Sequence, residues 1–206
     1  MRAGLTLRRI ADDVFEILVA DARQAQTLAS ALRAAGRADE VVAGLASVAI
    51  QFDPREQNSV EAWLNQVGDL KHQIQPDLPI IEMAIQYGGE NGPDIEWVCE
   101  RLGLTQSAFI EEHCAREHTV EMLGFTPGFS YISGVSESWA VPRLHNPRHR
   151  VGAGSVGISA GYTGIYALAG PGGWPIIGRT SAQLFDPGAP EPFLLSPAQR
   201  VKFRPV

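Results

Sequence analysis

The residues best suited to binding a small anion lie in the second half of the chain. Twelve of the 21 glycines fall between Gly124 and Gly178, and glycine lets backbone N–H groups approach a ligand closely. Arginine adds paired donors for carboxylate or phosphate oxygens. We therefore predict an anion site built from backbone N–H groups at 154–157 and 172–173, together with Arg179 and Arg148.

An aromatic run lies at the start of this glycine-rich region. Phe125, Phe129 and Tyr131 flank Pro127 within seven residues. Such side chains line pockets for small planar ligands, and they equally fill hydrophobic cores, so both interpretations stay open. The segment RLHNPRHR at 143–150 carries three arginines and two histidines, which suits a solvated loop or a surface for anions or a partner.

Two glycine patterns imitate nucleotide-binding motifs. Gly152, Gly154 and Gly157 have the spacing of a dinucleotide fingerprint, but no amphipathic helix follows, and no acidic residue occurs until Asp186. GWPIIGRT at 173–180 is similar to a Walker A sequence, but its bulky residues fill the positions of the phosphate cradle. The sequence therefore predicts no nucleotide site on this chain itself.

Ser155 and the histidines are weak candidates for catalysis. An α/β-hydrolase serine needs a histidine later in the chain, whereas the last histidine is His149. No two of His113, His118, His145 and His149 form an i, i+4 pair on one predicted helix with a carboxylate base between them. We predict no metal site and assign no catalytic side chain.

The elements of the first half follow from apolar periodicity. Apolar residues at helical spacing between Asp21 and Gly36 predict one helix, and Asn58 with Glu61 predicts the start of a second. The strand-like segments LTLRRI, VFEILV and VVAGLASVAIQF alternate with these helices. The first eighty residues therefore predict a small α+β layer.

The second half is predicted to begin near residues 76–84, where two prolines precede the strand PIIEMAIQY. Two short helices should follow, one with Pro93 at its first position and Gly103 after its end, the other opened by Thr105. From Val120 onward, short apolar segments divided by Gly, Pro and Asn predict a β-barrel or sandwich with the helices packed against it.

Composition is typical of a globular cytoplasmic protein. Hydrophobic residues make up 45% and charged residues 19%, and no stretch approaches the roughly 20 apolar residues that span a bilayer. The two cysteines match neither a disulfide framework nor a metal spacing. Residues 1–123 hold 10 basic and 20 acidic residues, whereas residues 124–206 hold 7 and 3. This modest excess favours small anions over nucleic acid as ligands.

Three separated motifs resemble, almost residue for residue, the family of 5-oxoprolinase B subunits (PxpB). They are GFTPGFSYISGV, PRLHNPRHRVGAGSVGISAGYTGIY and GPGGWPIIGRTSAQLFDP, in that order. The likeness extends upstream through YGGENGPDIEWV and His113, and more loosely into the first half. The family includes allophanate hydrolase subunit 1 and the kinase inhibitor KipI.

The resemblance implies an α+β fold: an N-terminal ferredoxin-like domain, residues 1–80, and a cyclophilin-like β-barrel, residues 81–206. It implies a larger cyclophilin-like partner, of the type of the 5-oxoprolinase C subunit or allophanate hydrolase subunit 2, and a third partner of the type of the 5-oxoprolinase A subunit. The assembled complex would open 5-oxoproline to glutamate at the cost of ATP. The alternatives are inhibition of a sensor histidine kinase and a role in an allophanate- or urea-type hydrolase or carboxyltransferase. Prolyl isomerisation rests on fold analogy alone.

Several positions depart from the family pattern. Tyr162 stands where glutamine is usual, so two donors and an acceptor are replaced by one hydroxyl, which would alter substrate choice if the position faces the ligand. The other departures are Gly152, Ala160, Ala167, Gly170 and His118. The complete predicted substrate-binding set is Phe125, Pro127, Phe129, Tyr131, Arg148, Gly154, Ser155, Gly157, Tyr162, Thr163, Tyr166, Gly172, Gly173, Trp174, Arg179 and Thr180.

Overall fold

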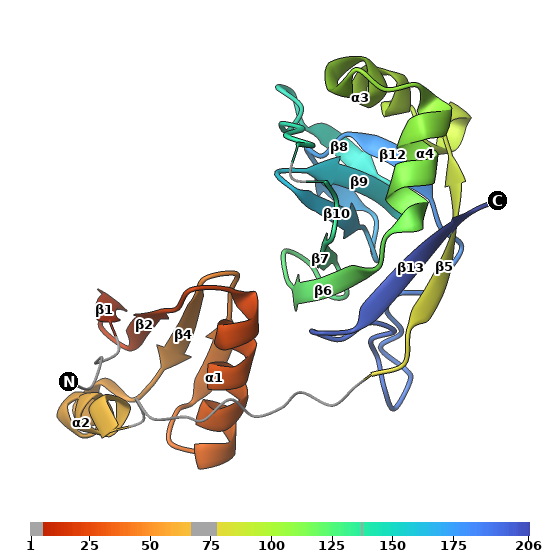
Figure 1. Ribbon diagram of the computed structural model, residues 1–206. Coiled ribbons are helices and arrows are strands. Elements are labelled where there is room, and N and C mark those ends of the chain that lie inside the picture. Colours follow the sequence, from red (N-terminus) through yellow and green to blue (C-terminus); the bar gives the residue numbers. More distant parts are fainter. Residues whose placement is uncertain (1–5, 67–77, 137) are drawn as a thin grey trace. The chain divides into compact units, whose positions relative to one another are not determined.

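The chain forms two compact units, Met1–Asp77 and Leu78–Val206. The structure is a computed structural model that describes residues 6–66, 78–136 and 138–206 (Figure 1). The first unit combines a sheet with helices, and the second is built around a closed barrel. The prediction of a mixed helix and strand chain that ends in a β-barrel is therefore confirmed.

The first unit holds one antiparallel sheet with the strand order β1-β2-β4-β3. Its strands are β1 (Thr6–Ala11), β2 (Val14–Leu18), β3 (Glu40–Ala43) and β4 (Ser47–Gln51). The described elements run β-β-α-β-β-α, whereas the ferredoxin-like motif runs β-α-β-β-α-β. The ferredoxin-like assignment therefore stays a prediction.

Helix α1 (Ala22–Ala35) begins and ends as its sequence predicts. The Asp21 side chain accepts a hydrogen bond from the Gln24 backbone N–H, and Gly36 ends the helix with a φ of 63°. The apolar residues of the predicted face are all buried, and the helix packs against β3 and β4.

Helix α2 (Gln57–Gln66) begins differently from its prediction. It starts one residue before Asn58 and continues from a 3₁₀ turn, η1 (Pro54–Glu56). Asp53 caps that turn by accepting a hydrogen bond from the Arg55 backbone N–H. The prediction of Asn58 as the N-cap is therefore wrong, because the chain is already helical at that residue.

Seven strands close the barrel of the second unit. Their order is β10-β7-β6-β13-β5-β12-β9, and β9 pairs back to β10. Each neighbouring pair is antiparallel except β13 with β5, which is parallel. The strands are β5 (Ile81–Tyr87), β6 (His118–Leu123), β7 (Ser130–Ser133), β9 (Ser155–Ser159), β10 (Tyr162–Ile165), β12 (Ile176–Arg179) and β13 (Arg200–Pro205).

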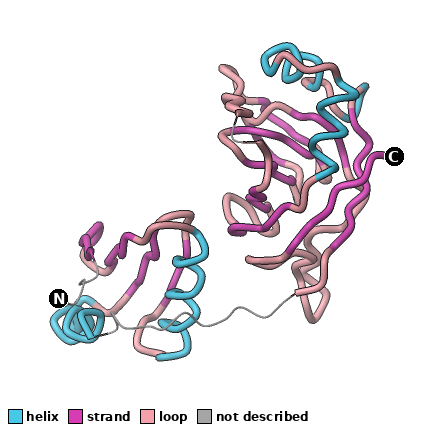
Figure 2. Tube along the Cα trace, in the orientation of Figure 1, coloured by secondary structure: helices cyan, strands magenta, loops and turns pink. Residues whose placement is uncertain are grey.

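Helices α3 (Ile95–Leu102) and α4 (Gln106–Ala115) lie on one side of this barrel, drawn in cyan in Figure 2. Thr105 caps α4, and Gly103 ends α3 with a φ of 69°, both as predicted. However, α3 begins at Ile95, so Pro93 is not its first helical residue. Asp94 holds the N-cap position without capping the helix, and its carboxylate makes other contacts.

Among the residues that the structure describes, the barrel unit contains two hydrophobic clusters. The larger fills the barrel with side chains such as Val120, Ile158 and Phe203. The smaller contains Phe129, Val151, Tyr166 and Ile176, with Tyr131 packed against it. Of the aromatic residues predicted from sequence, Phe129, Tyr131 and Tyr166 therefore belong to this smaller cluster, whereas Phe125 is exposed.

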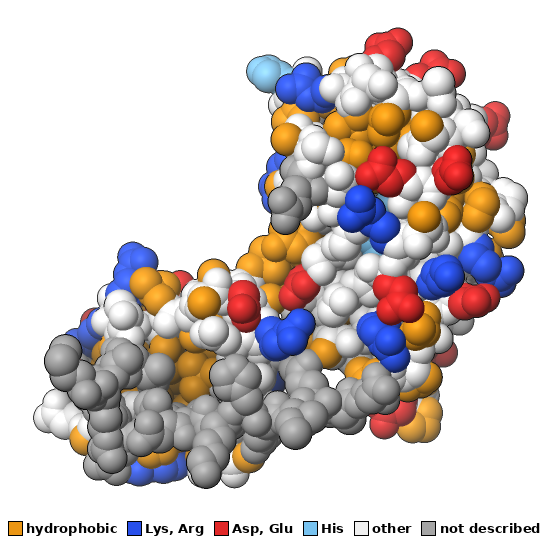
Figure 3. Space-filling view, viewed as in Figure 1, with side chains coloured by type: hydrophobic (Ala, Val, Ile, Leu, Met, Phe, Trp, Pro, Cys, Tyr) orange, Lys and Arg blue, Asp and Glu red, His pale blue; other side chains and the backbone are white. Residues whose placement is uncertain are grey.

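The surface of the barrel unit carries charges of both signs. Figure 3 shows basic and acidic side chains interspersed on the visible face. Arg204 and Glu82 form an exposed ion pair at 2.9 Å, of the kind that adds about 0 to 1 kcal/mol of stability. Within the described ranges, none of the helices is both long and apolar enough to cross a bilayer.

The turn between β9 and β10 holds a strained alanine. Ala160 has a φ of 50° and Gly161 a φ of 81°, as in a type I′ turn, and a side chain at such a φ costs roughly 1 kcal/mol. We expect Ala160→Gly to raise the free energy of unfolding by roughly 0.5 kcal/mol, because relief of strain exceeds the added chain entropy. Urea denaturation measures this, with Gly161→Ala as the opposite change. A loss of stability in both variants would contradict the strain.

Candidate functional site

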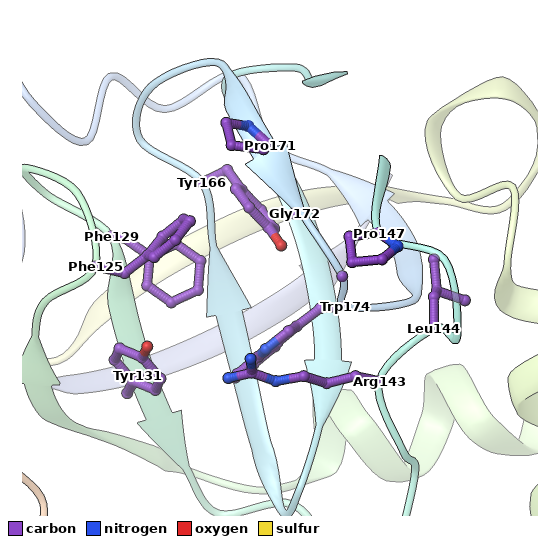
Figure 4. Close-up of a pocket in the computed structure, with 11 residues that line it drawn as sticks. Phe125, Phe129, Tyr131, Arg143, Leu144, Pro147, Tyr166, Pro171, Gly172 and Trp174 are labelled. Atoms are coloured by element: carbon purple, nitrogen blue, oxygen red, sulfur yellow. The ribbon is translucent and has the colours of Figure 1, made fainter. Parts of the chain in front are cut away.

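The barrel unit contains an aromatic cavity of about 250 Å³ (Figure 4). This volume lies below the roughly 300 to 1,000 Å³ of drug-sized sites, which suits a ligand of few atoms. Five of its eleven lining residues are aromatic: Phe125, Phe129, Tyr131, Tyr166 and Trp174. The other lining residues are Arg143, Leu144, Pro147, Pro171, Gly172 and Gly173.

Strand ends position the aromatic rings. Tyr131 lies on β7 and Tyr166 directly follows β10, while Trp174 lies between β11 (Gly170–Gly172) and β12. Phe129 contacts the other rings edge to face, with centroids 5.0 Å from Tyr166 and 5.7 Å from Trp174. Such contacts stabilise aromatic pairs beyond their buried area, so the cavity wall is held in shape before a ligand arrives.

Two glycines permit this packing. A Cβ atom at Gly164 would lie 2.6 Å from the Trp174 ring and 2.7 Å from the Phe129 ring. One at Gly172 would lie 2.8 Å from the Tyr166 ring. These separations are shorter than van der Waals contact, so glycine at both positions follows from the close approach of the rings to the backbone.

Tyr166 brings a hydroxyl group to the cavity. Burial raises the pKa of this phenol, although a backbone hydrogen bond from Trp174 and the charge of Arg143 act in the opposite direction. The hydroxyl is therefore neutral near pH 7. Because its oxygen accepts from the Trp174 backbone, its own proton remains available as a donor.

Arg148 is part of a structural cross-link. Its Nη2 lies 2.7 Å from Asp94 Oδ1, and Asp94 Oδ2 accepts a hydrogen bond of 2.6 Å from the Ile176 backbone N–H. The bridge joins the start of α3 to β12 and to β8 (Arg148–Val151), which pairs with β11. Its charge is thus paired within the fold, and Arg148 does not line the cavity.

Arg179 lies in a separate groove of about 440 Å³. Gly154 and Thr180 also line this groove, together with polar side chains such as Gln86 and Asn91. The Gly154 N–H donates to the Tyr166 carbonyl at 2.7 Å, and the Ser155 N–H donates to the Gly152 carbonyl at 3.2 Å. Two N–H groups of the anion site predicted at 154–157 and 172–173 are therefore paired within the fold, and Arg179 lies in a different hollow from Gly172 and Gly173.

The structure distributes the predicted site residues as follows. Seven line the aromatic cavity: Phe125, Phe129, Tyr131, Tyr166, Gly172, Gly173 and Trp174. Three line the groove: Gly154, Arg179 and Thr180. Ser155, Gly157 and Thr163 are buried in the barrel strands, Arg148 is in its ion pair, and Pro127 is exposed. Tyr162 lies beside Tyr131, with ring centroids 6.3 Å apart, and does not line the cavity.

The sequence prediction missed the cavity wall contributed by Arg143, Leu144, Pro147 and Pro171. The first three belong to the arginine-rich segment at 143–150, whose composition had indicated an anion surface or a solvated loop. The available signal was thus the cluster of cations beside glycine runs. This signal did not distinguish the role of Arg143 from that of Arg148. The roles differ because Arg148 pairs with Asp94, a residue distant in the sequence.

A polar network lies inside the barrel. His113 Nδ1 is 2.6 Å from the Tyr87 hydroxyl, and its Nε2 is 2.8 Å from the Thr163 hydroxyl. The His118 Nε2 lies 2.8 Å from the His113 carbonyl. Across the described part of the chain, no group of three or more metal-ligating side chains could hold a metal ion. The network therefore satisfies buried polar groups within the core.

Acid should destabilise the barrel through His113. Burial, together with the neighbouring His118, lowers the pKa of the fully buried His113 well below its usual 6.5. Below about pH 6.5, His113 therefore binds a proton in the unfolded chain but not in the folded chain. The free energy of unfolding consequently decreases as the pH falls from about 6.5 toward the pKa of the folded state. We expect the urea midpoint to decrease between about pH 7 and about pH 5.

A His113→Gln variant is the control for this pH effect. Its stability at pH 7 should be lower, because the fit to Tyr87 and Thr163 is disturbed. Its stability should also change less over the same pH interval than that of the parent chain. An equal pH slope in the two proteins would exclude His113 as the cause.

Comparison with known proteins agrees with this architecture. Residues 8–195 match the protein family described as carboxyltransferase domain, subdomain C and D. A protein named as the B subunit of 5-oxoprolinase from Escherichia coli O157:H7 is 46% identical over 132 residues, which cover 64% of this chain and 61% of the relative. A protein of the same name from Haemophilus influenzae is 37% identical over 171 residues, or 80% of this chain and 78% of the relative.

Solved structures extend the likeness. A conserved uncharacterized protein from Pyrococcus horikoshii matches with a TM-score of 0.60 and 36% identity, over 98% of this chain and 97% of that one. The Kluyveromyces lactis urea carboxylase matches with a TM-score of 0.78 over 98% of this chain and 22% of its own, and its 18% identity shows a shared fold alone. By its motifs, its family match and these relatives, the chain belongs to the family of 5-oxoprolinase B subunits.

Proposed function

We propose that this chain is one component of a cytoplasmic, ATP-dependent 5-oxoprolinase complex and that its aromatic cavity helps to bind the small cyclic amide. The observation that supports this most is the cavity, because it combines aromatic walls with a cationic residue in a chain 46% identical to a protein named as a 5-oxoprolinase B subunit. The barrel would correspond to the cyclophilin-like domain of the family, and the first unit to its ferredoxin-like domain.

The reaction itself requires more than this cavity provides. A lactam carbonyl is a poor electrophile, and ATP supplies the chemistry that makes its oxygen a phosphate leaving group. The segment at 173–180 offers no phosphate cradle, because Ile176–Arg179 forms strand β12. We place the nucleotide in the larger cyclophilin-like partner of the C-subunit type or in a third partner of the A-subunit type. This chain would bind and orient the substrate's carboxylate and ring.

Co-expression with partner subunits of the C-subunit and A-subunit types tests the proposal. The assembled complex should release glutamate from 5-oxoproline only when ATP is present, and this chain alone should release none. Omission of this chain from the mixture should reduce turnover to background. Equal turnover with and without this chain would remove its role in the reaction.

The family description favours a second candidate, a protein that handles a carboxylated amide in the manner of a carboxyltransferase. Allophanate supplied to the same complex in place of 5-oxoproline distinguishes the two. Hydrolysis of allophanate without turnover of 5-oxoproline would favour this second function. Inhibition of a sensor histidine kinase remains a sequence-based prediction without a structural observation in its favour.

A further inference from the structure

Arg143 is the cationic residue in the described lining of the aromatic cavity. Within the described ranges it makes no hydrogen bond or ion pair, whereas Arg148 is bound to Asp94 at 2.7 Å and Arg179 lies in the other groove. In Figure 4 the Arg143 side chain extends toward Trp174 and Tyr131, which line the same cavity. A guanidinium group thus lies at the cavity with donors free for a ligand.

The cavity offers donors without a competing carboxylate. None of its described lining residues is Asp or Glu. The neutral Tyr166 hydroxyl can donate as well, because its oxygen accepts from the Trp174 backbone, and the Arg143 charge is close enough to lower the pKa of this phenol. Two donors of different charge thus lie at a cavity whose lining is mainly aromatic and apolar, an arrangement complementary to an anionic group on a compact ring.

We propose that Arg143 binds the carboxylate of the ligand and thereby selects carboxylated rings over neutral ones of the same shape. The aromatic rings would contact the apolar faces of the ligand, and the Tyr166 hydroxyl would donate to a second oxygen of the ligand. Arg143 then determines specificity by binding the substrate, and it transfers no proton. This inference rests on the proposed function for the choice of 5-oxoproline as the ligand.

A ligand pair and a variant pair together test the role of Arg143. Isothermal titration of the full chain compares 5-oxoproline with 2-pyrrolidinone, which keeps the lactam ring and lacks the carboxylate. We expect Arg143→Ala to weaken 5-oxoproline binding about tenfold or more and to leave 2-pyrrolidinone binding unchanged. Arg143→Lys keeps the charge and loses the planar guanidinium group. Its affinity for 5-oxoproline should lie between those of the parent chain and Arg143→Ala. Arg150→Ala, an exposed change on the same arginine-rich segment, is the control.

Each outcome decides the inference. If Arg143→Ala weakened the binding of both ligands equally, Arg143 would have a packing role only. Unchanged 5-oxoproline binding in Arg143→Ala would overturn the proposal, and so would a parent chain that does not bind 5-oxoproline. Glutamate release by the assembled complex, measured in parallel, reports separately on the proposed function. Turnover with an unaltered KM in Arg143→Ala would refute only the role of Arg143. Carboxylate-selective binding without any turnover would refute only the 5-oxoprolinase assignment.

Discussion

Replacement of Trp174 by alanine should lower the free energy of unfolding of the barrel unit by about 3 kcal/mol, at the lower end for loss of a buried aromatic ring. The Trp174 ring is buried, and it packs over Gly164 and against Phe129 and Tyr131. Its removal deletes one cavity wall and leaves the neighbouring rings without an edge-to-face partner. Urea denaturation followed by circular dichroism measures the loss.

Two variants separate the role of this ring from general effects of tryptophan removal. Trp97 is 39% exposed on α3, so Trp97→Ala should cost less than about 1 kcal/mol. Trp174→Phe keeps an aromatic ring over Gly164 and should recover more than half of the stability. If Trp174→Ala were as stable as Trp97→Ala, the cavity wall would not depend on the Trp174 ring.

Asp94→Ala should cost about 2 kcal/mol, because it leaves two donors without their acceptor. The side chain of Asp94 is 13% exposed and that of Arg148 is 33% exposed, so water replaces only part of the lost interaction. The Ile176 N–H also loses its acceptor. Because Arg148 lies on β8, which pairs with β11, the change should also loosen the strand that carries Pro171 and Gly172.

Chemical denaturation of Asp94→Ala beside Glu82→Ala provides the comparison. Glu82 pairs with Arg204 at the surface, where both side chains are more than half exposed, so its removal should change stability by less than about 0.5 kcal/mol. Asp94→Asn, which keeps an acceptor for the Ile176 N–H, should lose about half as much as Asp94→Ala. If Asp94→Ala and Glu82→Ala lowered the free energy of unfolding equally, the Asp94–Arg148 bridge would contribute no more than an exposed ion pair.

Local sequence signals predicted the elements whose ends depend on near neighbours. Asp21, Gly36 and Gly103 each act within one helical turn, and all three behave as expected. The helix starts predicted at Asn58 and Pro93 were wrong for a different reason. The turn η1 precedes α2, and the Asp94 carboxylate before α3 accepts a hydrogen bond from the distant Ile176 N–H and does not cap the helix. A helix start that depends on distant strands is not encoded in its own residues.

The cavity was only partly predictable for the same reason. Its aromatic residues are close in sequence to the glycine runs and could be selected by type. Arg148 is paired through a contact with Asp94, 54 positions away in the sequence, and no local pattern predicts that pairing. The glycine-rich sequence likewise predicted a free donor at the Gly154 N–H. In the fold, this N–H donates a hydrogen bond to the Tyr166 carbonyl.

The position of β13 has a consequence during synthesis. This strand lies between β5 and β6, and its parallel pairing joins residues near 81–85 to residues near 201–205. A nascent chain therefore carries β5 and β6 with open edges until residues 200–205 have left the ribosome. Open strand edges recruit other chains into aggregates. The barrel should accordingly depend on chaperones while translation is under way, and a ribosome stalled before Arg200 should expose the chain to proteases.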